Sequence, residues 1–128
     1  MKLSIMLNYA GNIRELADEV SALEKAGLDC VWVAEAYSFD AISMMGYLAA
    51  KTETVEIGSA IVNVYSRTAT LMAMSFAGLD YVSNGRINCG LGASGPQVIE
   101  GFHGVAYGSP CSESRNTWKS ADPPGSAR

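Results

Sequence analysis

Hydrophobic and polar positions along the chain follow two alternating periods, one typical of buried strands and the other of amphipathic helices. The pattern predicts a strand at residues 3–8, then a helix that begins after Asn12 as its N-cap, with Glu15 placed to complete a capping box. Three more units follow. They are a strand at 30–34 with a helix from Asp40 to Lys51, a strand at 55–62 with a helix at 68–82, and a strand at 86–91.

This repeated strand–helix unit predicts the α/β fold class, with parallel strands joined by right-handed crossovers and helices outside the sheet. The predicted strands begin near residues 3, 30, 56 and 86, so the spacing of the unit is nearly constant. Both a (β/α)8 barrel and a doubly wound sheet are built from such units. The periodicity does not distinguish the two architectures.

Composition narrows the class of protein. The chain has 128 residues, of which 48% are hydrophobic and 17% charged, and this apolar content is typical of a folded domain rather than of a linker. The sequence contains no uncharged run long enough to span a membrane, and its formal charge of −4 comes without a basic cluster for nucleic acid. Because residues 1–15 do not resemble a signal peptide, we expect a cytoplasmic protein that binds a small-molecule substrate.

The composition changes sharply after Pro110. Residues 1–110 predict one partial domain, whereas residues 111–128 are poor in large apolar side chains and predict a disordered C-terminal tail. Three cysteines without C-x-x-C spacing predict neither a disulfide framework nor a metal site. We expect Cys30 and Cys89 to be small buried hydrophobic residues. Helical spacing predicts core positions for four methionines, namely Met44, Met45, Met72 and Met74.

Polar side chains gather at the expected carboxyl ends of the strands, where ligands bind in parallel α/β sheets. These ends carry amides, carboxylates, phenols and a glycine loop, at Asn8 and Tyr9, at Glu35, Tyr37 and Asp40, at Asn63, Tyr65, Ser66 and Arg67, and at 92–95. The amino ends carry less polar variety, namely Lys2, Asp29, Glu56 and Arg86. This contrast predicts a ligand site at the carboxyl edge.

Individual residues of this edge have competing interpretations. Glu35 is either the functional carboxylate of the site or the partner of a nearby arginine, and the sequence favours neither. Asp40 is better explained as a helix cap than as a catalytic group. His103 has no catalytic partner in the sequence, so a structural role is favoured.

The segment Gly90-Leu-Gly-Ala-Ser-Gly95 matches the G-x-G-x-x-G pattern, whose backbone N–H groups can cradle a phosphate. As a dinucleotide fingerprint the match is weak, because three strand–helix units precede it and Glu113, the later acidic residue, lies in the predicted tail. It still predicts a phosphate-binding loop of another α/β fold. A NAD-type dinucleotide-binding half-domain stays open as an alternative.

Four segments together resemble the luciferase-like monooxygenase superfamily, and within it the branch that uses the deazaflavin coenzyme F420. They are residues 32–37 (Trp-Val-Ala-Glu-Ala-Tyr), 58–63 (Gly-Ser-Ala-Ile-Val-Asn), 90–97 (Gly-Leu-Gly-Ala-Ser-Gly-Pro-Gln) and 100–104 (Glu-Gly-Phe-His-Gly). The likeness extends from residue 1 to about residue 110. It implies the N-terminal half of a (β/α)8 TIM barrel, about four β/α units, with the cofactor at the carboxyl edge.

The resemblance also implies roles for individual residues. Glu35 matches an acidic, catalytic residue of the rim, although Ala36 stands where several relatives place a histidine. A non-prolyl cis peptide at Ala60–Ile61 would lie behind the cofactor ring, and Asn63 would face its pyrimidine edge. The loop that would hold the cofactor's side chain and phosphate consists of Gly92, Ala93, Ser94, Gly95, Pro96 and Gln97. The implied chemistry is hydride transfer with coenzyme F420, or oxygen activation in relatives that use FMN.

A complete barrel needs about 250 residues, so we expect the chain to be a truncated fragment of such an oxidoreductase, inactive alone. Open strand edges would then lack partners, as would the side chains expected to face the barrel interior: Ile5, Leu7, Val31 or Val33, and Ile61. A homodimer through the exposed strand edges would close a barrel by symmetry. A non-catalytic remnant or interaction module is the remaining alternative.

Overall fold

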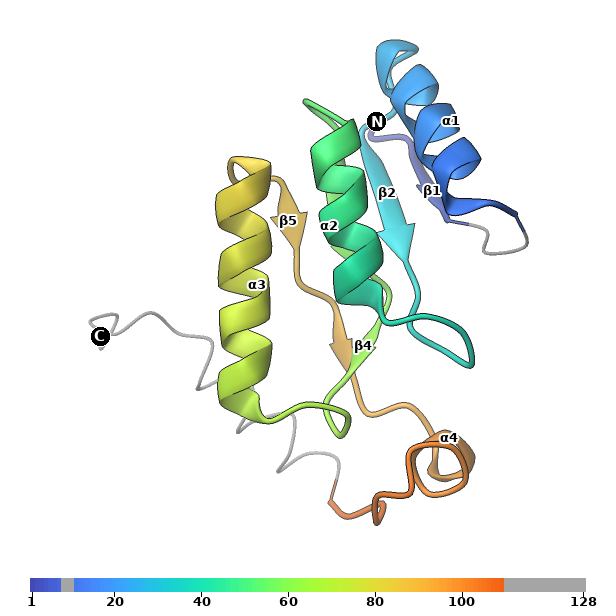
Figure 1. Ribbon diagram of the computed structural model, residues 1–128, viewed down its shortest axis with the longest axis vertical. Coiled ribbons are helices and arrows are strands. Elements are labelled where there is room, and N and C mark those ends of the chain that lie inside the picture. Colours follow the sequence, from blue (N-terminus) through green and yellow to red (C-terminus); the bar gives the residue numbers. More distant parts are fainter. Residues whose placement is uncertain (8–10, 110–128) are drawn as a thin grey trace.

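A computed structural model describes residues 1–7 and 11–109 of the chain (Figure 1). The elements are, in order, β1 (Ser4–Met6), α1 (Ile13–Lys25), β2 (Cys30–Val33), α2 (Ala41–Lys51), β3 (Glu56–Ser59), β4 (Val62–Asn63), α3 (Ala69–Ser83), β5 (Ile87–Asn88), β6 (Leu91–Gly92) and α4 (Pro96–Ile99). The predicted tail at 111–128 and the rim residues Asn8 and Tyr9 lie outside the described residues. Within residues 1–7 and 11–109, no helix has the length and apolarity needed to cross a membrane.

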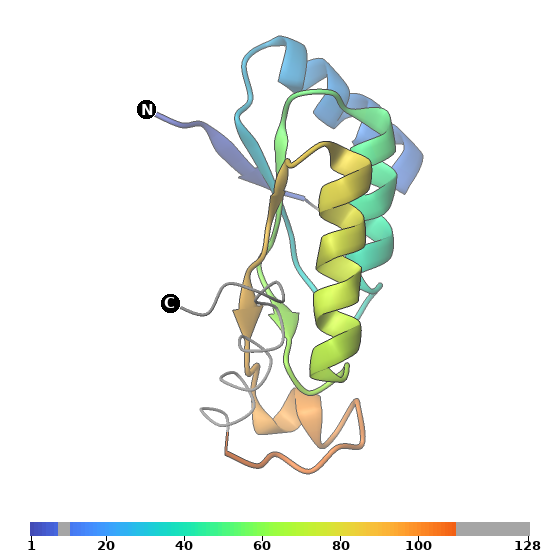
Figure 2. The same cartoon turned by 90° about the vertical axis from the view of Figure 1, so that its left-hand side faces the viewer.

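The main sheet has its strands in sequential order, β1-β2-β3-β5, and all of its pairs are parallel. Helices α1, α2 and α3 lie on one face of this sheet, and no helix among residues 1–7 and 11–109 covers the other face (Figure 2). A doubly wound sheet reverses its strand order and places helices on both faces. Sequential order with cover on one side is the arrangement of a barrel wall, so the chain forms half of a (β/α)8 barrel.

Each of the three long helices begins at a polar cap that the local sequence supplies. The side chain of Asn12 accepts from the backbone N–H of α1 at 3.0 Å, and Glu15 lies 3.5 Å from the amide of that cap. Asp40 and Thr68 cap α2 and α3 in the same way. Helix α3 ends at Ser83, and Asn84 caps it with a φ of 58°, the left-handed conformation typical of helix C-termini.

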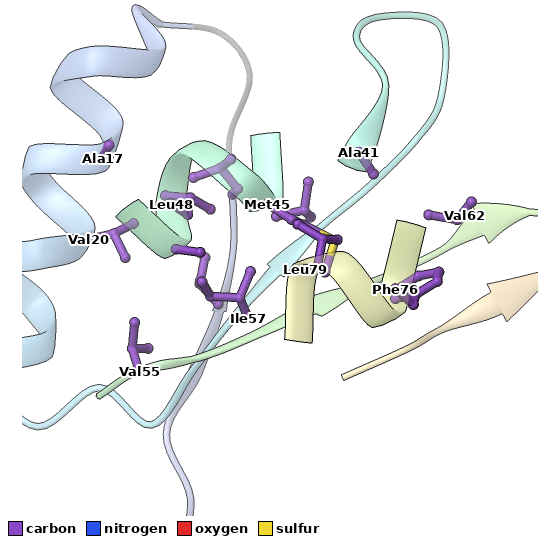
Figure 3. Packing of buried hydrophobic residues seen from close by; sticks show 14 of the residues in the cluster. Ala17, Val20, Ala41, Met45, Leu48, Val55, Ile57, Val62, Phe76 and Leu79 are labelled. Carbon is purple, nitrogen blue, oxygen red and sulfur yellow. The ribbon is translucent and has the colours of Figure 1, made fainter. Parts of the chain in front are cut away.

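The core fills the space between the helices and the covered face of the sheet (Figure 3). Val31 and Ile57 from the strands, with Met45 and Leu48 from α2, are fully buried there. The prediction for Met74 is wrong, because its side chain is 66% exposed. Met72 is buried, and a residue two positions further along a helix lies on nearly the opposite side.

The expectation that Ile5, Leu7, Val31 and Val33 face the barrel interior is wrong, because these four side chains belong to or pack against the helix-covered core. The open face carries the alternate positions, and the ring of Trp32 covers Gly58 so closely that a Cβ there would overlap it. Strand side chains alternate between faces, so a shift of one position exchanges the two sets. The homodimer through the outer edges of β1 and β5 stays a prediction.

The strands predicted at 55–62 and 86–91 are each interrupted. The peptide bond Ala60–Ile61 is cis, as the resemblance implied, and it separates β3 from β4. After this break the chain forms a second parallel ladder, in which β4 pairs with β6. Cys89 lies between β5 and β6 and is exposed, so the prediction that it is buried is wrong, whereas Cys30 is buried as predicted.

Candidate functional site

The carboxyl edge of the sheet is organised around an ion pair between Glu35 and Arg67. Glu35 follows β2, and Arg67 lies in the loop between β4 and α3. The guanidinium donates from Nη2 to Oε1 at 2.7 Å and from Nη1 to Oε2 at 2.8 Å, which is the bidentate geometry of a strong charge-assisted pair. The two side chains are only 6% and 13% exposed. Of the two interpretations of Glu35, the structure therefore shows the arginine partner, and a catalytic role stays a prediction.

Glu35 also ties together the elements around it. Its carboxylate accepts from the backbone N–H of Ala41 at 3.1 Å, at the start of α2, and from that of Asn63 at 3.4 Å, in β4. Burial by itself would raise the pKa of Glu35, but the hydrogen bonds from Arg67 and Ala41 outweigh it, so the pKa is lowered. The same contact raises the pKa of Arg67. Both groups are therefore charged at neutral pH.

Asp40 serves the helix and the ion pair together. Its carboxylate accepts from the backbone N–H of Ser43 at 3.2 Å, which confirms the predicted helix cap. It also accepts from Nη2 of Arg67 at 3.2 Å. Burial would raise the pKa of Asp40, but the bonds from Ser43 and the charge of Arg67 lower it.

Asn63 is buried next to this pair and is only 1% exposed. Its Oδ1 accepts from the backbone N–H groups of Tyr65 at 3.1 Å and Ser66 at 2.8 Å. Its Nδ2 lies 3.5 Å from Oε2 of Glu35 and 3.3 Å from Nε2 of His103. Both ends of the amide thus contact protein atoms, and the expected placement of Asn63 against a cofactor ring stays a prediction.

Two glycines of the G-x-G-x-x-G segment are explained by packing. A Cβ on Gly90 would overlap the carbonyl oxygen of Ser59, and one on Gly92 would lie 3.0 Å from the side chain of Ile61. Ser59 and Gly90 also exchange two hydrogen bonds of 2.9 Å through the serine hydroxyl. These glycines therefore let β5 and β6 approach the cis-peptide break closely, without any requirement for a dinucleotide.

The remainder of the predicted cofactor loop leads from β6 into α4. Ser94 has a φ of 54°, and its carbonyl accepts from the hydroxyl of Tyr107 at 3.3 Å. Gly95 precedes α4, and Pro96 and Gln97 form its first residues. Gly92 pairs with Asn63, so one end of this loop adjoins the Glu35–Arg67 pair, and binding of a cofactor by the loop stays a prediction.

A cleft of about 300 Å³ opens at the ion pair, and we call it the carboxyl-edge cleft. Its lining includes Glu35, Asp40, Ser66, Arg67, Phe102 and His103. The sequence indicates Arg67 only as one polar residue of the edge and favours a structural role for His103. Phe102 was not singled out, and its ring packs edge-on against Tyr37 at 5.4 Å between centroids. An arginine after one strand and a glutamate after the neighbouring strand were the signal for the pair.

Comparison with known proteins agrees with the fold. A family model described as luciferase-like monooxygenase matches residues 1–118. The match extends eight residues beyond Pro110, the point at which the composition changes. It covers most of the chain.

Individual relatives match most of this chain in sequence or in structure. A protein of Mycobacterium tuberculosis, whose name places it among the coenzyme F420-dependent oxidoreductases, is 38% identical over 117 residues, which are 90% of this chain and 34% of that protein. The F420-dependent tetrahydromethanopterin reductase from Methanopyrus kandleri superposes with a TM-score of 0.79 at 18% identity, over 94% of this chain and 38% of its own. A type II Baeyer-Villiger monooxygenase of Pseudomonas putida, in complex with FMN, gives 0.77 at 15% identity over 93% and 38%. The chain thus spans about a third of the length of the relatives that it matches.

Proposed function

Because the chain belongs to the luciferase-like monooxygenase family, we propose that it supplies half of a cofactor site for coenzyme F420, in an oxidoreductase that transfers a hydride. The observation that carries the proposal is the convergence of Glu35, Asn63 and Gly92 at one edge, from the ends of three neighbouring strands. F420-dependent and FMN-containing proteins both occur among the relatives. We propose F420 rather than FMN because the F420-dependent relative from Mycobacterium tuberculosis is 38% identical to this chain, whereas the FMN-containing monooxygenase is 15% identical.

The residues present fit a flavin or deazaflavin in part. Ala60, Ile61, Gly92, Ala93 and Gly95 are half-buried, and Ser94, Pro96 and Gln97 are exposed, so a ligand can reach the cis peptide and the loop. The side chain of Asn63 does not fit the role expected from the resemblance, because it is buried and bonded within the protein. We therefore propose that the loop and the cis peptide contact the cofactor, and that Asn63 acts through its neighbours.

When bound, a deazaflavin supplies the centre that gains or loses the hydride, while the protein supplies orientation and electrostatics. Glu35 remains charged through its pair with Arg67, so we assign it to holding the arginine and the start of α2 rather than to proton transfer. The guanidinium of Arg67 also lines the carboxyl-edge cleft, with its Nη1 and Nη2 groups bonded to Glu35, Ser66 and Asp40. In this proposal the Glu35–Arg67 pair forms part of the cleft wall against which a small-molecule substrate binds.

Titration of the purified chain with three cofactors tests the proposal. Oxidised F420, FMN and NADP⁺ are added separately, and binding is followed by cofactor fluorescence or by calorimetry. We expect saturable binding of F420 that is tighter than that of FMN. Ser94→Ala should weaken F420 binding by a few fold, which corresponds to about 1 kcal/mol for one lost hydrogen bond. The matched control Ser21→Ala, on α1, should leave it unchanged.

Each other result contradicts a defined part of the proposal. Tighter binding of FMN would replace F420 as the cofactor. Binding of NADP⁺ without F420 or FMN would favour the dinucleotide-binding half-domain. Failure of all three cofactors to bind would favour the non-catalytic remnant or interaction module. We expect no turnover from the chain alone, because it spans about a third of the length of its relatives.

A further inference from the structure

The single histidine of the chain, His103, lies at the wall of the carboxyl-edge cleft. Its Nε2 is 3.3 Å from Nδ2 of Asn63, forty positions earlier in the sequence. An imidazole nitrogen can donate or accept a hydrogen bond, depending on where the ring carries its hydrogen. The state of His103 therefore depends on which way the amide of Asn63 is turned.

Three contacts fix the orientation of that amide. Its Oδ1 faces the backbone N–H groups of Tyr65 and Ser66, which only donate, so this atom is the carbonyl oxygen. The other end faces the carboxylate of Glu35, which accepts, so it is the NH2 group. A reversed amide would place its NH2 group against two N–H donors. Because Asn63 is 1% exposed, water cannot compensate for that mismatch.

The same NH2 group therefore donates to Nε2 of His103, which must be an unprotonated acceptor. We infer that Asn63 is a positioning residue that holds His103 as the neutral imidazole with its hydrogen on Nδ1. With Nε2 occupied, the ring nitrogen left for a molecule in the cleft is Nδ1, which donates. His103 then acts in the cleft as a hydrogen-bond donor to a carbonyl or hydroxyl oxygen, and Nε2 does not act as a base.

The part of this inference that concerns a bound molecule rests on the proposed function, whereas the tautomer does not. The sequence favours a structural role for His103, because it shows no catalytic partner for this residue. In the structure His103, which follows α4, has Asn63 of β4 as its partner. Neutral imidazole is also the form that polarises an acceptor without carrying a charge into the site.

Nitrogen NMR of the imidazole ring tests the inference directly. Because the chain has one histidine, a long-range ¹H–¹⁵N correlation spectrum shows a single pair of ring nitrogens. At neutral pH we expect Nε2 at a pyridine-type shift and Nδ1 at a pyrrole-type shift. A nitrogen–nitrogen coupling between Nδ2 of Asn63 and Nε2 should also be present. The opposite shifts, an average of the two tautomers, or no coupling would overturn the inference.

Two matched variants test whether Asn63 itself sets the tautomer of His103. Asn63→Asp keeps an oxygen for the two backbone donors but removes the NH2 group, so Nε2 should become protonated and its pyridine-type signal should be lost. Asn88→Asp is the control, because Asn88 also donates to a glutamate, Oε2 of Glu56 at 3.0 Å, and that glutamate lies at the amino edge. The control should leave the spectrum of His103 unchanged. A wild-type-like spectrum in Asn63→Asp would contradict the inference.

The outcome is independent of the cofactor titration, since the spectra are recorded without F420 or FMN. If Asn63→Asp does not fold, the wild-type shifts and the coupling still decide the tautomer. Failure of F420 to bind would overturn the proposed function and leave the tautomer in place. A wrong tautomer would overturn the donor role and leave the cofactor proposal in place.

Discussion

The two edges of the sheet each hold a glutamate and an arginine that are partly buried, yet these charged groups bond to different kinds of partner. At the amino edge, Arg86 and Glu24 bond mainly to the main chain of neighbouring elements. At the carboxyl edge, Glu35 and Arg67 bond chiefly to each other and to the side chains around them. The difference separates groups that hold the fold together from groups that can serve a ligand.

Arg86 illustrates the structural case. Its guanidinium makes five hydrogen bonds of 2.7–3.0 Å, four of them to carbonyl oxygens of Ala49, Thr52, Val55 and Ser83 and one to the hydroxyl of Thr52. A guanidinium has five N–H donors, so its capacity is fully used. These bonds satisfy main-chain acceptors at the ends of α2 and α3. No donor is left for another molecule.

Glu24 is the acidic counterpart at the same edge. Its carboxylate accepts from the backbone N–H groups of Glu53, Thr54 and Val55 at 2.6–3.2 Å and so ties α1 to the start of β3. Glu24 itself lines a cleft of about 310 Å³, close in volume to the carboxyl-edge cleft, so the two edges differ in the partners of their charged groups and not in the presence of a cleft. We therefore interpret Glu24 and Arg86, whose partners are mainly main-chain groups, as a structural amino-edge clasp, and the side-chain pair of Glu35 and Arg67 as part of the candidate site.

The largest expected effect comes from breaking the carboxyl-edge pair. Arg67→Met leaves the buried carboxylate of Glu35 without its main partner, and loss of one member of a buried pair costs about 4 kcal/mol of unfolding free energy. The control is Lys51→Met, since Lys51 pairs with Asp18 at 3.6 Å on the surface and should change stability by less than about 0.5 kcal/mol. Urea denaturation followed by far-UV circular dichroism measures both. Equal effects would mean that the pair is not buried in solution.

The second-largest expected loss of stability comes from disturbing the close contact between Gly90 and the backbone of Ser59. Gly90→Ala places a Cβ against the carbonyl of Ser59 and should cost about 3 kcal/mol, because main-chain atoms must move. Gly78→Ala is the matched control in α3, where a Cβ meets no atom within 4 Å, and it should stabilise the helix by up to about 1 kcal/mol. Thermal denaturation gives the two shifts in opposite directions. An unchanged melting temperature in Gly90→Ala would contradict the explanation of the G-x-G-x-x-G segment by packing.

A smaller loss is expected from the amino-edge clasp. Arg86→Met leaves several carbonyl acceptors unpaired and should lower the unfolding free energy by about 2 kcal/mol. Arg86→Lys should recover only part of it, because an ammonium lacks the planar fork of donors. If the folded variants bind F420 as the wild type does, the clasp is structural. Weakened binding would contradict the division between the two edges.

The smallest effect is the contribution of each glutamate to acid stability. The pKa values of Glu35 and Glu24 are both lowered, by Arg67 and Ala41 in the first case and by backbone N–H groups in the second, against the opposing effect of burial. A lowered pKa stabilises the fold above the ordinary value of 4.5, and this stabilisation is lost as the pH falls through the native pKa. Glu35→Gln and Glu24→Gln should each flatten the fall of the urea midpoint on acidification. An unchanged slope in either variant would contradict the assigned contact.

The sequence predicted the helices well, because a helix cap depends on a side chain and a backbone N–H that are only a few residues apart. Asp40 is a cap as expected, and the helix predicted at 68–82 differs from α3 by one residue at each end. The strand breaks follow from pairing between β4 and β6, which are far apart along the chain, so periodicity could not show them. The resemblance, by contrast, correctly implied the cis peptide at Ala60–Ile61.

The candidate site was predictable as a place but not as a set of partners. Polar variety at the carboxyl ends located Glu35, Asn63 and Arg67 at one edge. Which of them pair depends on contacts between segments 28–40 residues apart, including the contact of Asn63 with His103. Arg86 shows the same limit at the other edge, because its sequence position gives no sign of five main-chain and hydroxyl partners.

The measurement that tests the difference between the two edges most directly is a ¹H–¹⁵N NMR titration of the chain with oxidised F420. We expect the largest shift changes at the amides of Glu35, Asn63, residues 92–95, Gln97 and His103, with the amides of Glu24 and Arg86 unchanged. Changes centred on Glu24 and Arg86, or no changes under conditions in which F420 is bound, would contradict it.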